Sequence, residues 1–225
     1  MQKYDTPTPI SAVLDIPAGR IQVIAADRAD TTVEVLPANA SKDRDVKAAE
    51  QTKVEYSDGV LQIETSAAKH QILGPSGSIE VTIKLPAGSR IEAKAAGAEF
   101  RAVGRLGDVA FDGAHGAHGA AKLDEAASVR LTALAGDVSV GRLGGPAEIS
   151  TLQGDIHIAE AVRGSVVLRT QSGDVTVVAA HGVSASLDAG TGYGRIHNSL
   201  KNTEGTADLN IHATTTHGDI TARSL

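Results

Sequence analysis

Histidine and aspartate are the residues of this chain that could carry chemistry, because imidazole and carboxylate groups bind metal ions and transfer protons. The sequence contains eight histidines. His115 and His118 lie close together in a Gly/Ala-rich stretch that could fold around an ion. No carboxylate or cysteine stands at a recognised ligand spacing from them. The histidines are therefore interpreted as surface residues, and neither a metal ion nor another cofactor is predicted.

The second group of candidates consists of aspartates that follow glycine at a regular interval. The series comprises Gly136-Asp137, Gly154-Asp155, Gly173-Asp174, Gly194-Arg195 and Gly218-Asp219. Carboxylates stacked about 5 Å apart repel by about 1 kcal/mol each at the surface, so turn hydrogen bonds or a bound cation must offset that repulsion. Calcium-binding β-rolls space their Gly and Asp residues about half as far apart. These residues are therefore predicted to be structural turn positions, with each aspartate hydrogen-bonded to turn backbone.

The glycines of this series are 18, 19, 21 and 24 residues apart. A period near 20 with alternating apolar residues is typical of a solenoid, in which each repeat forms one coil. Ahead of each turn lies a second strand whose inward residues read small, large, small, as in Val166, Leu168 and Thr170. His157 and His197 then fall in one outward column, two coils and about 10 Å apart, too far to share a zinc ion.

The composition agrees with this architecture. The chain has 24 glycines, 2% aromatic residues and no cysteine. Glycine supplies the positive φ that corners require, and a thin interior suits small aliphatic side chains. Disulfides, thiolate metal sites and cysteine nucleophiles are excluded, and a net charge of −6 argues against nucleic acid as a partner.

The predicted fold class is all-β, a parallel β-helix-like solenoid with about 20 residues per coil. Residues 1–94 are expected to form an antiparallel β region with one short helix at Asp43–Gln51, and residues 95–225 to form the solenoid. The alternative is that the two parts make one continuous domain. The last coil, Thr214–Leu225, has no evident cap. Self-association through this C-terminal coil is therefore expected.

No segment of the sequence predicts membrane insertion or export. Met1–Pro9 carries charges and two prolines and has no apolar core, and no later run approaches the roughly 18 apolar residues of a membrane span. The expected location is the cytoplasm, with association with the cell envelope as the alternative.

Several segments together resemble a known family. They are LDIPAGRIQV (Leu14–Val23), AAEQTKVEYSDGVLQIET (Ala48–Thr65), IEVTIKLPAGSRIEAKAAGAEF (Ile79–Phe100), TLQGDIHI (Thr151–Ile158) and TQSGDVTV (Thr170–Val177). This combination resembles the bacterial putative-adhesin β-strand-repeat domain of unknown function, in its actinobacterial form. The resemblance implies the repeat fold and no catalytic motif. The sequence departs from the family pattern at Ala114–Gly119, where histidines replace the usual Ser-Gly-Asp type of turn.

The predicted function is a non-enzymatic binding or scaffold module for an unknown protein or cell-envelope partner. The chain has no GxSxG, P-loop or HExxH motif. The alternative is a carbohydrate-active or metal-dependent enzyme, because some β-helices act on polysaccharides through charged residues on one outer sheet. A mixed-sign outer column of that kind is predicted from Arg130, Glu148, Arg169, Asp188 and Asp208.

Overall fold

The structure is a computed structural model that describes residues 1–65, 77–202 and 205–225. The side chains of residues 114–118 are not part of this description. His70, and the side chains of His115 and His118, therefore lie outside the described residues.

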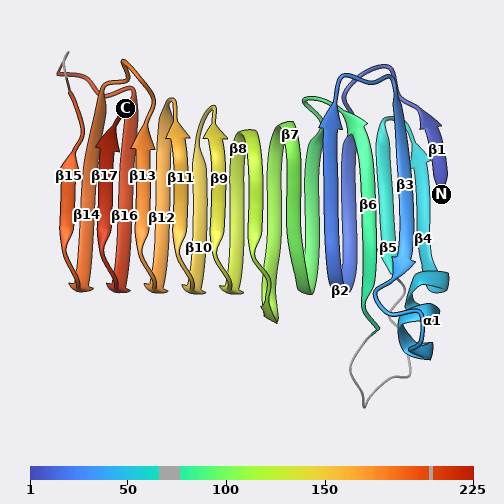
Figure 1. Cartoon of the computed structure of the whole chain (residues 1–225). Coiled ribbons are helices and arrows are strands. Elements are labelled where there is room, and N and C mark those ends of the chain that lie inside the picture. The colour runs from blue at the N-terminus through green and yellow to red at the C-terminus, as the bar shows by residue number, and fades with distance from the viewer. Residues whose placement is uncertain (66–76, 203–204) are drawn as a thin grey trace.

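Strands stacked in one long row form two facing sheets (Figure 1). Three long strands pass through both sheets: β2 (Ser11–Ala26), β7 (Arg90–His118) and β8 (Ala121–Ala135). The first sheet also contains, in spatial order, β4 (Thr52–Ser57), β5 (Val60–Thr65), β10 (Ala147–Gln153), β12 (Gly164–Ser172), β16 (Leu209–His217) and β14 (Ala185–Tyr193). The second contains β1 (Gln2–Asp5), β3 (Asp30–Pro37), β6 (Ile79–Pro86), β9 (Val138–Leu143), β11 (Ile156–Ala161), β13 (Val175–Ala179), β17 (Ile220–Ser224) and β15 (Ile196–Ser199).

Parallel pairing in constant register builds the core. Ile149 of β10 lies beside Leu168 of β12, which lies beside Ala213 of β16. All three are at most 1% exposed, as expected of residues that alternate toward the inside of a coil. The predicted β-solenoid is confirmed, and its interior is a thin layer of Ile, Leu, Val and Ala.

The order of the coils in space differs from their order in the chain. Strand β16 pairs with β12 on one side and β14 on the other, and β17 lies likewise between β13 and β15. The C-terminal coil is therefore an inner coil, and the prediction that it forms the open end is wrong. Among the described residues the open end is formed by β14 and β15, at the left of Figure 1. The reason is that β16 returns into a gap left between β12 and β14.

The antiparallel region is smaller than the sequence predicts. Antiparallel pairing joins β1 to β3, β3 to β6 and β4 to β5, whereas β2 pairs in parallel with β5, β6 and β7. The parallel coils thus begin at β2, and the boundary expected between residues 94 and 95 falls inside β7. The predicted helix is present as α1 (Asp43–Gln51), beside the antiparallel strands.

Candidate functional site

The predicted turn residues all lie at one corner of the solenoid, where the chain leaves the first sheet for the second. The N–H of Asp155 donates to Oδ1 of Asp137 at 2.9 Å, and the N–H of Asp174 donates to Oδ1 of Asp155 at 2.8 Å. The N–H of Asp219 continues the series to Oδ1 of Asp174 at 2.7 Å. Each carboxylate therefore accepts a hydrogen bond from the next coil in space, which offsets the repulsion between neighbouring aspartates.

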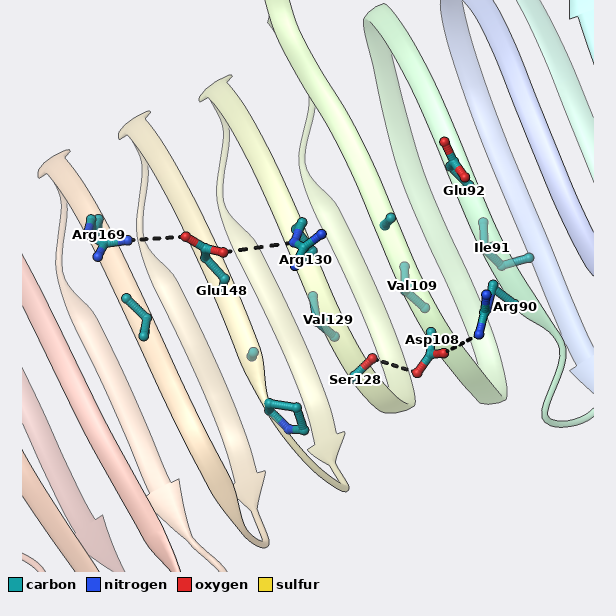
Figure 2. A pocket seen from close by; sticks show the side chains of 14 residues that line it. Arg90, Ile91, Glu92, Asp108, Val109, Ser128, Val129, Arg130, Glu148 and Arg169 are labelled. Carbon is teal, nitrogen blue, oxygen red and sulfur yellow. Dashed lines mark hydrogen bonds and ion pairs between the residues drawn. The ribbon is translucent and has the colours of Figure 1, made fainter.

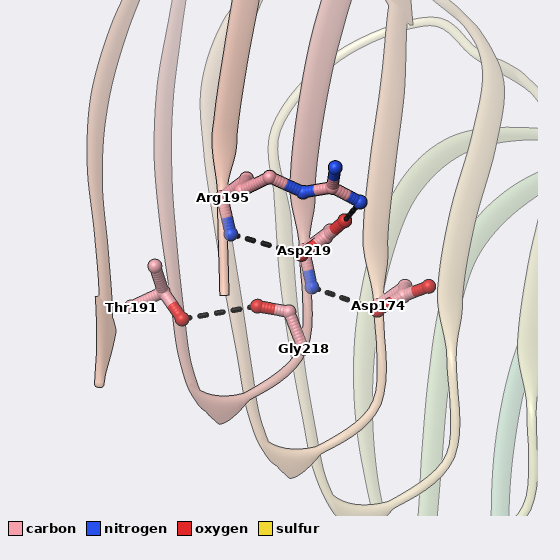
Figure 3. Close-up of polar contacts among 5 residues, drawn as sticks. All are labelled: Asp174, Thr191, Arg195, Gly218 and Asp219. Atoms are coloured by element: carbon pink, nitrogen blue, oxygen red, sulfur yellow. Dashed lines mark hydrogen bonds and ion pairs between the residues drawn. The ribbon is translucent and has the colours of Figure 1, made fainter. Parts of the chain in front are cut away.

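Arg195 ends this row of hydrogen bonds at the last coil in space (Figure 3). Its N–H donates to Oδ1 of Asp219 at 2.9 Å, and its guanidinium binds Oδ2 of the same carboxylate at 3.0 Å. Two hydrogen bonds from Arg195 lower the pKa of Asp219 below its ordinary value. The bond from the backbone N–H has the larger effect, and the bond from the guanidinium has the smaller one. Arg195 takes the place of aspartate in the outermost coil. No described coil lies beyond it whose backbone N–H would need a carboxylate as hydrogen-bond acceptor.

Glycine is required at this corner by conformation and by space. Gly154 and Gly218 have φ of +133° and +147°, a region that residues with a Cβ rarely adopt. A Cβ on Gly218 would also overlap the carbonyl oxygen of Gly173 on the neighbouring coil. The close approach of successive corners therefore excludes any side chain at this position.

Threonine hydroxyls complete the corner. The hydroxyls of Thr170, Thr215 and Thr191 donate to the carbonyl oxygens of Gly154, Gly173 and Gly218 at 3.2, 3.0 and 3.0 Å. Each threonine hydroxyl thus supplies a hydrogen-bond donor to the carbonyl oxygen of a corner glycine on an adjacent coil. The sequence pattern assigned Thr170 only to the interior and predicted no role for Thr191 or Thr215, although the fixed position of these threonines three residues before the Gly-Asp or Gly-Arg pair was a usable signal.

The outer face of the first sheet carries two neighbouring groups of ion-paired side chains, here together termed the charge ladder (Figure 2). It consists of Arg90, Asp108, Arg130, Glu148 and Arg169, on five successive rungs. The ladder lines an open groove of about 560 Å³, whose wall also includes Glu92 and Ser128.

Every member of the charge ladder is paired with a residue of a neighbouring rung. Asp108 binds the Arg90 guanidinium at 2.9 Å and accepts the Ser128 hydroxyl at 2.7 Å. Glu148 lies between two arginines, 3.9 Å from Arg130 and 3.5 Å from Arg169. The arginine side chains are more than half exposed, so these pairs order the face without burying charge.

A second hollow of about 430 Å³ continues this groove and shares Val167 and Arg169 with it. Within it, Nδ1 of His212 lies 3.2 Å from Oδ2 of Asp188. The predicted outer column is correct for Arg130 and Glu148, which are register partners, whereas Arg169 is in register with Ser150 and reaches Glu148 from two residues further along β12. Asp188 lies one rung further out than predicted, behind His212, because the coil order differs from the chain order. Asp208 lies outside the column because Asn210, two residues later, is already in register with Ser165 and Ser186 near the starts of β12 and β14.

The described histidines do not gather at one site. His157 and His197 share the outward column of the second sheet, but Thr176 and Thr221 stand between them. They are three coils apart, about 14 Å, and not two as predicted. Among the described residues there is no group of three or more His, Asp or Glu side chains placed to hold a metal ion.

A match to a protein-family model shows to which family the chain belongs. The Toastrack DUF4097 model matches residues 13–223, nearly the whole chain. The chain belongs to the Toastrack DUF4097 family. Membership of this Toastrack family confirms the resemblance seen in the sequence, while the actinobacterial subtype stays a prediction. The biochemical function of the family is unknown, and so is that of this β-repeat protein.

Solved structures of bacterial proteins align with nearly the whole of this chain. A putative adhesin from Bacteroides fragilis is 16% identical, with a TM-score of 0.56, over 98% of this chain and 95% of that one. A putative cell adhesion protein from Clostridium sporogenes is 12% identical, with a TM-score of 0.42, over 100% of this chain and 98% of that one. At such identities the Bacteroides protein supports the fold alone. A search of curated proteins finds no significant match. No described helix is long and apolar enough to cross a membrane.

Proposed function

We propose that this protein is a non-enzymatic binding module that docks a protein partner on the charge ladder. The observation that carries the proposal is the ladder itself, five exposed side chains of alternating sign along an open groove. Such a face selects a partner by charge register, because each misplaced contact sets like charges against each other.

The same geometry favours binding over catalysis. The carboxylates of Asp108 and Glu148 lie on different rungs of one flat face, and each is engaged by an arginine. A general acid or base needs a free path to the proton it transfers, and a nucleophile needs a base beside it. The ladder is better suited to holding a second surface than to attacking a bond.

Site-specific photo-crosslinking in native cells tests the proposal. A photoreactive residue replaces Val167, which lies between the two hollows, and in a control it replaces Thr176 on the outer face of the second sheet. We expect a discrete adduct from position 167 and none from position 176. Equal adducts from both positions, or none from either, would contradict the proposal.

A charge-reversal variant tests whether the cross-link depends on the charge ladder. Arg130→Glu combined with Arg169→Glu should abolish the adduct at position 167, because two of the three ladder cations are reversed. The matched control, Arg101→Glu with Arg223→Glu, makes the same change of charge at exposed positions of the second sheet and should leave the adduct intact.

The site of action is part of this proposal. We propose the cytoplasm as the site of action, as expected from the sequence. The alternative is the cell envelope, which is suggested by the description of a solved structure of similar fold as a putative adhesin. Cell fractionation with an antibody against the chain separates the two, since an envelope protein sediments with the membrane and wall fraction.

A further inference from the structure

The open end of the solenoid exposes a position that is buried in every other coil of its column. Val138, Ile156, Val175 and Ile220 lie in register in the second sheet and are at most 1% exposed. Ile196 occupies the next place in this column, yet 44% of it is exposed. Its surface is left open because no described strand lies beyond β15.

The two ends of the stack are finished differently. At the N-terminal end, β4 is antiparallel and carries Lys53 and Glu55, and α1 lies close to the antiparallel strands. Charged, antiparallel and covered edges resist pairing with other chains. The strands β14 and β15 contain neither lysine nor proline, and Tyr193 at the end of β14 is 74% exposed. Among the described residues no helix or antiparallel strand covers this end, although β14 carries the charged Asp188 and the N–H of its first residue, Ala185, donates to the carbonyl oxygen of Lys201.

A partner for this end must supply two strands. The chain reverses at Gly194, so β14 and β15 run in opposite directions in sheets about 10 Å apart. A second solenoid end offers two strands with this spacing. A two-fold axis normal to the sheets would place β14 against β14 and β15 against β15 of the partner, both antiparallel.

The area fits a weak, reversible contact. The nine residues of β14 are about 30 Å long and the four residues of β15 about 13 Å, and each sheet is about 10 Å thick, which gives roughly 430 Å² per copy. Two copies bury roughly 900 Å², in the range of weak interfaces. We infer that the chain forms a head-to-head dimer through β14 and β15, with Ile196 covered by the partner.

Light scattering coupled to size exclusion tests the dimer. We expect a dimer that dissociates on dilution for the native chain and a monomer at every concentration for Ile196→Lys, because a charge enters the covered face. Val60→Lys is the matched control: Val60 is 40% exposed on β5 at the far end of the stack, and this variant should remain a dimer. A native monomer at all concentrations, or an Ile196→Lys dimer, would overturn the inference.

Cross-linking tests the geometry without disturbing the core. The chain has no cysteine, and a Cβ on Gly190 of β14 meets no atom within 4 Å. Gly190→Cys should therefore give a covalent dimer with a short bismaleimide, whereas Val60→Cys should not. Larger species from the native chain would show a head-to-tail stack, and dimers from Val60→Cys would show contact between two N-terminal ends; either result would refute the two-fold arrangement.

Discussion

The N–H of Asp219 donates a 2.7 Å hydrogen bond to Oδ1 of Asp174, 45 residues earlier in the chain. A complete coil, formed by β14 and β15, lies between these two residues in sequence but beyond both of them in space. The row of aspartates therefore follows the spatial order of the coils, and each carboxylate identifies the coil that packs next to it.

The Asp155 carboxylate is expected to stabilise the corner through its acceptor oxygen. Asp155→Ala leaves the Asp174 N–H without this partner and should lower the free energy of unfolding by about 1 kcal/mol. Asp155→Asn keeps an acceptor oxygen and should cost less. Urea unfolding followed by circular dichroism measures both, and an equal loss in the two variants would argue against the hydrogen bond as the cause.

Gly218 is expected to tolerate no side chain. Gly218→Ala forces a Cβ into the carbonyl of Gly173 at a φ of +147° and should cost about 3 kcal/mol or more. Gly190→Ala is the matched change in open space and should alter stability by less than about 0.5 kcal/mol. Thermal unfolding of the two variants compares them directly. Similar midpoints would contradict the close packing of the corners.

The stability of the outer coils should depend on the charge of Asp219. Because the pKa of Asp219 is lowered in the folded chain, its contribution is present above the ordinary aspartate value of about 4 and is lost as the pH falls through the folded pKa. Asp219→Asn removes this titration. The difference in unfolding midpoint between native chain and variant should shrink from pH 6 to pH 2, and a constant difference would contradict the assignment.

Backbone amides should exchange in the spatial order of the coils. We expect β16 and β17 to exchange as slowly as β12 and β13, because each has a strand on both sides. Strands β14 and β15 should exchange faster, unless they are covered in a dimer. Hydrogen exchange with mass spectrometry on Ile196→Lys resolves the two sets. Rapid exchange confined to residues 209–224 would contradict the inner position of the C-terminal coil.

The repeat was predictable because strand alternation and turn formation depend on residues close together in the sequence. Alternation of period two assigned Val166 and Leu168 to the interior, and the glycine before each aspartate marked the corner. The start of the parallel stack was missed because its first corner, Pro17-Ala18-Gly19, lacks aspartate. Gly19 nevertheless has a φ of +129°, similar to the later corners.

The order of the last coils was not predictable from the pattern. Every coil presents the same inner surface of small and large aliphatic residues, so β14 and β16 are equivalent candidates to follow β12. The signals lay in the departures from the repeat, the longer intervals around Gly194 and the arginine at position 195. The charge ladder was predicted in part, because Arg90 and Asp108 precede the regular repeat and join it only through the register of β7.

The inner position of β16 and β17 also constrains how the chain can fold. Without them, β14 and β15 would stand about 10 Å from β12 and β13, twice the spacing at which strands bond. Growth of the stack one coil at a time therefore stops at β13, and the strands β14 to β17 must assemble as a single cooperative block. The conformational entropy of closing that long loop is lost before any stabilising contact forms. Assembly of this end of the solenoid is therefore the slow step of folding.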